Sequence, residues 1–386
     1  MRRPISVARL GAITVLLVSA LLAPAAATAS TRSAAAGAPT AAKYAKAGPY
    51  VPGVTTLDLG DRKVEVWYPA DRGSQRGKRH DVYNLRDWLP AAIRDKVPVE
   101  TAPYETSSYR DVRASRKGPF PLVLFSHGYA SFRDQSTFLT EHLASWGFVV
   151  AAPDHLERGL ASVLGEVPAN KKTDAEVLRA TVDLLRAENA RKGSRLHGEV
   201  RKGKIAVTGH SAGGFASIAF GAQPDVVTYV ALSAGAGSGS DTGQTVSGLP
   251  KKPSMFVTGA ADTIVPLTEV QPTFDAAPAP KRLVVLGNAG HLAMTDICLI
   301  GAGKGGVIAI ADSLGIQIPA SLRPLATDGC EAGRLPARSG FPVVDHYVTA
   351  QLRAAFHLDK KPVGLDDRTA DRWNPNVVTV TYAHKP

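Results

Sequence analysis

Short apolar runs without polar alternation recur through the middle of the chain. They occupy residues 121–125, 148–152, 204–208, 227–233, 254–259 and 282–286. Strands of a parallel sheet have this pattern when helices cover both faces, because both sides of each strand are then buried. The runs therefore predict a mostly parallel sheet.

The segments between these runs have the period of amphipathic helices. Apolar residues recur at helical spacing in 138–146 and in 177–185, and Thr173 and Glu176 form a capping box ahead of the second segment. A last helix is expected at 344–356. Alternating strands and helices predict an α/β fold with a doubly wound sheet and right-handed crossovers.

The region ahead of the first run has a different pattern. Residues 55–59 and 62–68 alternate between apolar and polar positions around Gly60 and Asp61, which predicts an antiparallel hairpin at the N-terminal edge of the fold. Residues 71–118 are charged and irregular and predict no element, and the tail up to Pro386 is equally uninformative. A hydrophobic content of 44% is enough for one large core, so we expect a single domain over residues 48–386.

The N-terminus has the layout of an export signal. Three arginines precede an apolar stretch over residues 10–22, and Ala27-Thr28-Ala29 has the small-x-small spacing of a cleavage site. A membrane anchor needs about 20 apolar residues, so no stable membrane span is expected. We predict that residues 1–29 are removed, that 30–47 form a flexible leader of small and polar residues, and that the mature protein is secreted.

The chain is basic, with 45 lysines and arginines against 34 acidic residues and a net charge of +11. Loss of the signal removes three arginines and no acid, which leaves +8. Such a charge usually means either a solvated surface or attraction to anionic walls and lipids. Basic residues do not alternate with aromatic ones in any run, so we expect no nucleic-acid partner. The oligomeric state stays open.

A serine motif follows one of the predicted strands. Run 204–208 leads into Gly209-His210-Ser211-Ala212-Gly213, and small residues then open a helix. This is the G-x-S-x-G turn, in which glycines on either side let the chain bend sharply and raise the serine hydroxyl above the sheet. Ser211 is therefore the candidate nucleophile.

A serine nucleophile needs a base and a carboxylate that orients it. Asp262 and His291 each follow a later predicted strand, where the carboxyl ends of a parallel sheet meet. The order Ser211, Asp262, His291 is that of α/β-hydrolases. Asp262 could instead only cap a helix near Pro266, and Asp296 is the rival acid. This triad needs no metal and no cofactor, and we expect none.

Two backbone amides are expected to form the oxyanion hole. One is the amide of Ala212, directly after the nucleophile, and the other is that of Tyr129, in the turn after run 121–125. Asp154, at the end of a strand, is expected to be a structural hydrogen-bonding residue, and His210 is expected to pack beneath the serine turn.

The chain contains two cysteines, Cys298 and Cys330. An even count in an exported protein predicts a disulfide bond. It would stabilise the fold by about 3 to 4 kcal/mol and hold the segment that follows His291 without taking part in the chemistry.

Several stretches resemble a known group of enzymes. They are Leu124-Phe125-Ser126-His127-Gly128-Tyr129, residues 142–155, Gly48-Pro49-Tyr50 and Val66-Trp67-Tyr68-Pro69. They resemble bacterial α/β-hydrolases, esterases and lipases related to platelet-activating-factor acetylhydrolases and to cutinase-like polyester hydrolases. The likeness covers roughly residues 48–70 and 119–296 and implies the α/β-hydrolase fold.

The chain departs from these families at informative positions. The acid at Asp262 fits the cutinase and dienelactone-hydrolase arrangement, whereas the acetylhydrolase acid follows an earlier strand. Ala212 stands where polyester hydrolases usually have methionine, and dienelactone hydrolases have cysteine where this chain has Ser211. Segment 233–248 is too short for a large cap, which predicts a fairly open cleft.

These features predict a serine carboxylic-ester hydrolase that forms an acyl-enzyme on Ser211 from a small-molecule or lipid ester. A peptidase, an amidase or an acyltransferase would use the same residues, and fold alone does not separate them. A non-catalytic binding protein is the remaining alternative.

Overall fold

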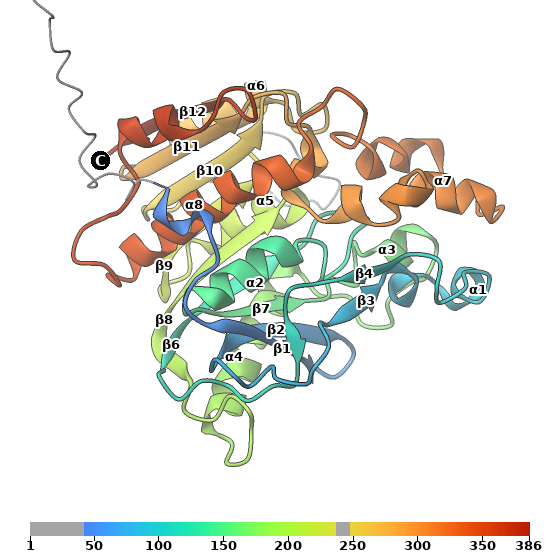
Figure 1. Cartoon of the computed structure of the whole chain (residues 1–386), viewed down its shortest axis with the longest axis horizontal. Helices are drawn as coiled ribbons and strands as arrows, with labels where there is room; N and C mark the ends of the chain where they lie inside the picture. The colour runs from blue at the N-terminus through green and yellow to red at the C-terminus, as the bar shows by residue number, and fades with distance from the viewer. Residues whose placement is uncertain (1–41, 237–247) are drawn as a thin grey trace, which may run out of the picture. The chain divides into compact units, whose positions relative to one another are not determined.

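A mixed sheet organises the chain in the computed structural model, which describes residues 42–236 and 248–386. Within these residues, ten strands pair in the order β12-β11-β10-β9-β8-β6-β7-β2-β1-β5 (Figure 1). The central strands are parallel: β6 (Phe120–Ser126), β7 (Val149–Pro153), β8 (Val200–His210), β9 (Val226–Leu232), β10 (Ser254–Gly259) and β11 (Lys281–Leu286). The predicted mostly parallel sheet is thus confirmed.

Antiparallel pairing occurs toward both edges of the sheet. β1 (Val51–Asp58) and β2 (Lys63–Ala70) form the predicted hairpin, and β2 joins it to β7 in antiparallel pairing. The short β5 (Tyr109–Arg110) pairs in parallel with β1. At the opposite edge, β12 (Val380–Lys385) runs antiparallel to β11. The sequence did not predict β12, because a half-exposed edge strand lacks a continuous apolar run.

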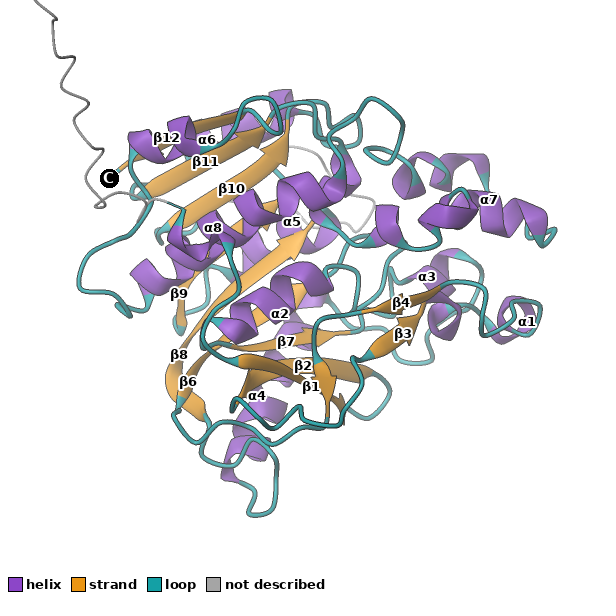
Figure 2. Ribbon diagram, viewed as in Figure 1, coloured by secondary structure: helices purple, strands orange, loops and turns teal. Residues whose placement is uncertain are grey.

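Helices cover both faces of the sheet. Apolar residues of α2 (Thr137–Ser145) and α8 (Ala337–Ala355) pack on one face, and those of α4 (Asp174–Ala190), α5 (Ala212–Phe220) and α6 (Leu267–Ala276) pack on the other (Figure 2). The predicted capping box of Thr173 and Glu176 opens α4. Helix α8 begins before the predicted residue 344, because it continues through Pro342.

Residues 71–118 form small elements that the sequence did not predict. β3 (Val82–Asn84) pairs with β4 (Pro103–Glu105), and a 3₁₀ turn (Leu85–Trp88) and α1 (Ala91–Arg94) lie between them. They pack with residues around α7 (Gly306–Ser313) into small apolar clusters apart from the main core. Figure 1 shows α1, α7 and the short α3 (Leu160–Val163) on the side toward which strands β8 and β10 point.

The folded part of the chain begins earlier than the expected residue 48. Tyr44 lies in a 3₁₀ turn (Lys43–Ala45) and is fully buried. Its hydroxyl donates to Asp359 over 2.6 Å, and its ring meets that of Trp146 edge to face. Residues 42–47 of the expected leader are therefore packed against the domain. The expected export signal, 1–29, and residues 30–41 lie outside the described residues.

No helix within residues 42–236 and 248–386 has both the length and the apolar character of a membrane span.

A buried glutamate in α2 is hydrogen-bonded to the segment of residues 71–118. Glu141 accepts hydrogen bonds from the amide of Ser107 over 2.8 Å and from the hydroxyl of Ser108 over 2.9 Å. Burial raises its pKa from 4.5 to about 7. The folded protein therefore holds this proton more tightly than the unfolded chain does, and the contribution of Glu141 to stability falls as the pH rises from about 4.5 to about 7.

Replacing Glu141 with glutamine removes this titration. We expect the free energy of unfolding of the variant, relative to the parent protein, to improve by about 3 kcal/mol between pH 4.5 and pH 8. Urea unfolding of both proteins at the two pH values measures the difference. An identical difference at both values would contradict the raised pKa.

Candidate active site

Ser211 lies in a strained turn between β8 and α5. Its φ of 54° and ψ of −122° are rare for a residue with a side chain. A Cβ on Gly213 would lie 1.9 Å from the carbonyl oxygen of Ser126, and one on Gly209 would lie 2.3 Å from that of Gly213. The glycines of the motif thus serve close packing of the backbone, since neither has a positive φ. The predicted strand, turn and helix are all present.

Asp262 and His291 form a buried hydrogen-bonded pair. Asp262 follows β10, and His291 begins a 3₁₀ turn (His291–Met294) after β11. Nδ1 of His291 donates to the carboxylate, 2.9 Å from Oδ2 and 3.1 Å from Oδ1. Oδ1 also accepts the amides of Ile264 over 3.0 Å and Val265 over 2.8 Å. The carboxylate is therefore fixed, and it leaves Nε2 of His291 free to accept a proton.

His210 connects this pair to the serine turn. It precedes Ser211, its ring lies 4.7 Å from the ring of His291 between centroids, and its Nε2 donates to the His291 carbonyl oxygen over 2.9 Å. Burial lowers the pKa of His210 to about 3, so its ring stays neutral. Among the described residues, no hydrogen bond joins the Ser211 hydroxyl to His291; such bonds often tighten only when substrate binds.

Asp328 joins the two loops that hold the acid and the base. One carboxylate oxygen accepts the amide of His291 over 2.6 Å, and the other accepts the amide of Thr263 over 3.1 Å. The carbonyl oxygen of Asp328 accepts the amide of Leu292 over 2.9 Å. The sequence did not point to Asp328, because it lies in a segment without a predicted element.

The predicted disulfide bond between Cys298 and Cys330 is present. Cys330 follows Asp328 by two positions, so the bond holds the Asp328 segment against the chain that leaves His291. This arrangement agrees with the predicted structural role.

Removing the disulfide is expected to lower both stability and turnover. The double substitution Cys298→Ala and Cys330→Ala should reduce the free energy of unfolding by about 3 kcal/mol, since the closed loop is of moderate length. Reductant should lower the melting temperature and the esterase rate of the parent protein and leave the double variant unaffected. Thermal unfolding and ester hydrolysis with and without dithiothreitol measure both effects. An unchanged parent protein would contradict the structural role.

The turn after β6 lies against the serine. A Cβ on Gly128 would come within 3.4 Å of the Ser211 Cβ. The amide of Gly128 donates to Gln135 over 2.6 Å. Within the described part of the chain, neither the amide of Tyr129 nor that of Ala212 donates to another protein group. Both amides expected in the oxyanion hole are therefore available to a ligand at Ser211.

Arg158 is hydrogen-bonded to the backbone of this turn. It is 3% exposed, and its Nη1 donates to the carbonyl oxygens of His127 and, over 2.9 Å, of Gly128. Nη2 donates to the hydroxyl of Ser126 over 2.9 Å, and Nε to the carboxylate of Asp174 over 3.1 Å. Arg158 was not among the predicted site residues, because nothing in its local sequence indicates which backbone it contacts.

His127 gives a second hydrogen bond to the same carbonyl. Its Nε2 accepts the amide of His155 over 2.9 Å, so Nδ1 carries the proton that is donated to the oxygen of Gly128 over 2.8 Å. Burial and the nearby charge of Arg158 hold the pKa of His127 well below its usual range. The ring therefore remains a neutral donor at this point.

The rival acid, Asp296, has another role. Its Oδ2 accepts the amide of Thr137 over 2.5 Å and the hydroxyl of Thr137 over 2.6 Å, at the start of α2. Burial raises the pKa of Asp296 to about 7.

Asp154 accepts hydrogen bonds from Arg133 over 2.7 Å and from the indole of Trp88 over 3.1 Å, which agrees with its expected structural role.

Comparisons with known proteins support the fold. Residues 93–259 match the family model described as Chlorophyllase. Platelet-activating factor acetylhydrolase of Cavia porcellus is 32% identical over 82 residues, which cover 21% of this chain and 19% of that protein. This chain therefore aligns with about a fifth of that relative.

A solved structure extends the likeness over most of the chain. The ferulic acid esterase from Streptomyces cinnamoneus superposes with a TM-score of 0.56 at 22% identity, over 86% of this chain and 96% of that one. These matches, together with the sheet order and the serine turn, agree with the resemblance seen in the sequence. In fold this chain is similar to that esterase, and parts of its sequence are similar to the chlorophyllase family model and to the acetylhydrolase.

Proposed function

We propose that this chain is a serine carboxylic-ester hydrolase that forms an acyl-enzyme on Ser211. The observation that carries the proposal is the buried pair of Asp262 and His291 beside a serine in a strained turn. The free amides of Tyr129 and Ala212 complete the set of groups that acyl transfer needs.

In the first half of the reaction, Ser211 Oγ attacks the ester carbonyl while His291 Nε2 takes its proton. The carbonyl oxygen becomes an oxyanion and accepts the amides of Tyr129 and Ala212. His291 then gives its proton to the leaving alcohol, and the C–O bond to that alcohol breaks. Asp262 remains ionised and stabilises the protonated imidazole.

In the second half, water replaces the alcohol. His291 removes a proton from the water, the hydroxide attacks the acyl-enzyme, and the C–O bond to Ser211 breaks as the serine regains its proton. Amide cleavage and acyl transfer would use the same groups, and an added alcohol that diverts product from the acid to a new ester would identify acyl transfer.

The names of the matched proteins, an acetylhydrolase and an esterase, support an ester as substrate. The N-terminal signal expected at 1–29 supports export, and N-terminal sequencing of protein from the culture medium tests this part of the proposal.

Covalent trapping tests the mechanism. A p-nitrophenyl alkylphosphonate should release about one equivalent of p-nitrophenol per chain and leave a phosphonyl group on Ser211, because the tetrahedral phosphonate mimics the oxyanion intermediate. Peptide mass spectrometry locates the adduct, and Ser211→Ala is the control. No adduct, or an adduct on another residue, would overturn the serine mechanism.

A further inference from the structure

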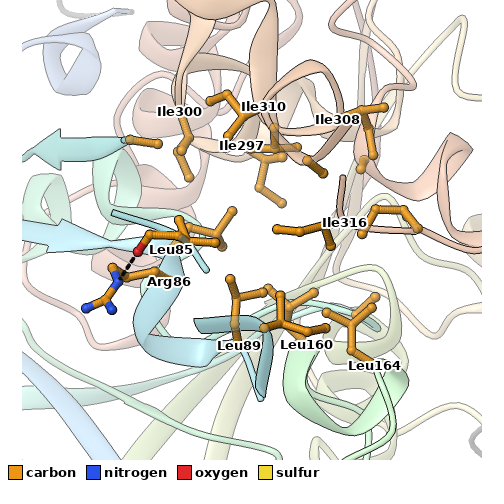
Figure 3. Close-up of a pocket in the computed structure, with 18 of the residues that line it drawn as sticks. Leu85, Arg86, Leu89, Leu160, Leu164, Ile297, Ile300, Ile308, Ile310 and Ile316 are labelled. Carbon is orange, nitrogen blue, oxygen red and sulfur yellow. Dashed lines mark hydrogen bonds between the residues drawn. The ribbon is translucent and has the colours of Figure 1, made fainter. Parts of the chain in front are cut away.

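An apolar pocket of about 130 Å³ lies among the elements that the sequence did not predict (Figure 3). Leucine, isoleucine, valine and alanine make up most of its lining, and they come mainly from residues 84–102 and 297–326. Figure 3 shows Ile297, Ile300 and Ile310 on one side of the space and Leu89, Leu160 and Leu164 on the other. These walls come from segments that lie far apart in the sequence.

The charged residue of the lining does not offer its charge to a ligand. Arg86 Nε donates to the carbonyl oxygen of Val97 over 2.8 Å, and its Nη2 donates to that of Arg94 over 3.2 Å. Asn84, also in the lining, accepts the amide of Arg86 over 3.2 Å and donates to Val99. These polar groups are thus already paired within the chain. The surface that remains suits a hydrocarbon group.

The pocket borders the turn that carries the expected oxyanion donor. Ala130, one of its lining residues, directly follows Tyr129. Leu160, from the opposite side, donates its amide to the carbonyl oxygen of Ser131 over 2.9 Å, which fixes α3 to the same turn. Ile297 continues the segment that begins at His291. The pocket therefore begins one residue along the chain from the expected donor at Tyr129.

We propose that this pocket receives the unbranched alkyl chain of the acyl group, and that the preferred substrates are medium-chain esters of about six acyl carbons; this rests on the proposed ester hydrolase function. A dry cavity of about 150 Å³ is known to hold a six-carbon ring, and this pocket is slightly smaller. Phe132 is the only aromatic residue among the lining residues that the structure describes, so the walls favour an aliphatic chain.

A chain-length series tests the assignment. We expect kcat/KM for p-nitrophenyl esters to rise at least tenfold from acetate to hexanoate, since each buried methylene adds up to about fourfold, and to fall again toward palmitate. Ala311→Phe, which fills the pocket from α7, should remove the gain of hexanoate over acetate. Ala309→Phe, on the exposed side of the same helix, is the matched control.

Binding of a ligand to an inactive variant tests the pocket independently of ester hydrolysis. Calorimetric titration of Ser211→Ala with hexanoate should show binding that Ala311→Phe abolishes and Ala309→Phe retains. Leu89→Trp fills the pocket from the opposite wall and should act like Ala311→Phe. The same chain-length series is then measured with glycerol triesters of these acids. Comparing it with the p-nitrophenyl series shows whether the alkyl chain is supplied by a lipid or by a simple ester.

The outcomes distinguish the two proposals. An unchanged chain-length profile in both filling variants, with esters still hydrolysed, would overturn the pocket assignment and leave the hydrolase standing. Absence of any ester hydrolysis, with Ser211 unlabelled by the phosphonate, would overturn the proposed function, while hexanoate binding blocked by Ala311→Phe would still support the pocket.

Discussion

Replacing Asp262 with asparagine is expected to lower kcat for p-nitrophenyl butyrate by about 10⁴-fold while KM changes little. Oδ1 of Asp262 is held by the amides of Ile264 and Val265, so the asparagine oxygen should stay there. The new NH₂ group then faces Nδ1 of His291 in place of Oδ2. The imidazole must place its proton on Nε2, and it can no longer accept one from Ser211.

Asp296→Asn is the matched control for this prediction. Asp296 is as deeply buried as Asp262, but its carboxyl group caps α2 through Thr137. Its substitution should change the midpoint of urea unfolding and retain most of kcat. Steady-state kinetics and urea unfolding of both variants decide between the two acids. Loss of kcat in Asp296→Asn with Asp262→Asn active would show that the acid is wrongly assigned.

The central sheet and the three candidate catalytic residues could be predicted because each rests on a local signal. Continuous apolar runs mark strands β6 to β11, and a parallel sheet brings their carboxyl ends to one edge. Ser211, Asp262 and His291 each follow such a run within a few residues. The placement of all three at one edge of the sheet therefore follows from the order of strands without knowledge of the loops.

The supporting residues could not be predicted, because loop paths decide their contacts. Asp328 reaches the His291 amide across 37 positions, and Arg158 reaches the carbonyl of Gly128 across 30. The elements that line the pocket were not predicted for a related reason. Each very short helix or 3₁₀ turn buries only a few apolar residues, which are too few to establish a helical period. The open cleft expected from the short segment 233–248 stays a prediction, because most of that segment, 237–247, lies outside the described ranges.

Arg158 illustrates what such a contact can contribute. The carbonyl of Gly128 and the amide of Tyr129 belong to one peptide unit, and in a trans peptide the two groups point in opposite directions. Arg158 Nη1 and His127 Nδ1 both donate to that carbonyl oxygen. They therefore turn the Tyr129 amide away from Arg158, and the guanidinium charge polarises the peptide so that its N–H becomes a stronger donor.

Replacing Arg158 with methionine is expected to lower kcat for p-nitrophenyl butyrate by about 100-fold, which is the usual effect of losing one oxyanion donor. KM should change little, because the donor acts mainly on the charge that develops in the transition state. Affinity for a butylboronic acid, which forms a tetrahedral anion on the serine, should fall by a similar factor. Arg158→Lys should recover part of both, since an ammonium group can reach one carbonyl but not the whole set.

Arg62→Met separates positioning from simple stability. Arg62 is 2% exposed and is paired with Glu157 and Asp61, each over 3.0 Å, so its loss disturbs a comparable ion pair that makes no hydrogen bond to the Gly128 carbonyl among the described residues. It should lower the midpoint of urea unfolding and leave kcat and boronate affinity nearly unchanged. If Arg158→Met behaved in the same way, Arg158 would be a structural residue only. A parallel loss of kcat and boronate affinity in Arg158→Met alone would mean that this arginine positions the oxyanion hole from beneath the Tyr129 peptide.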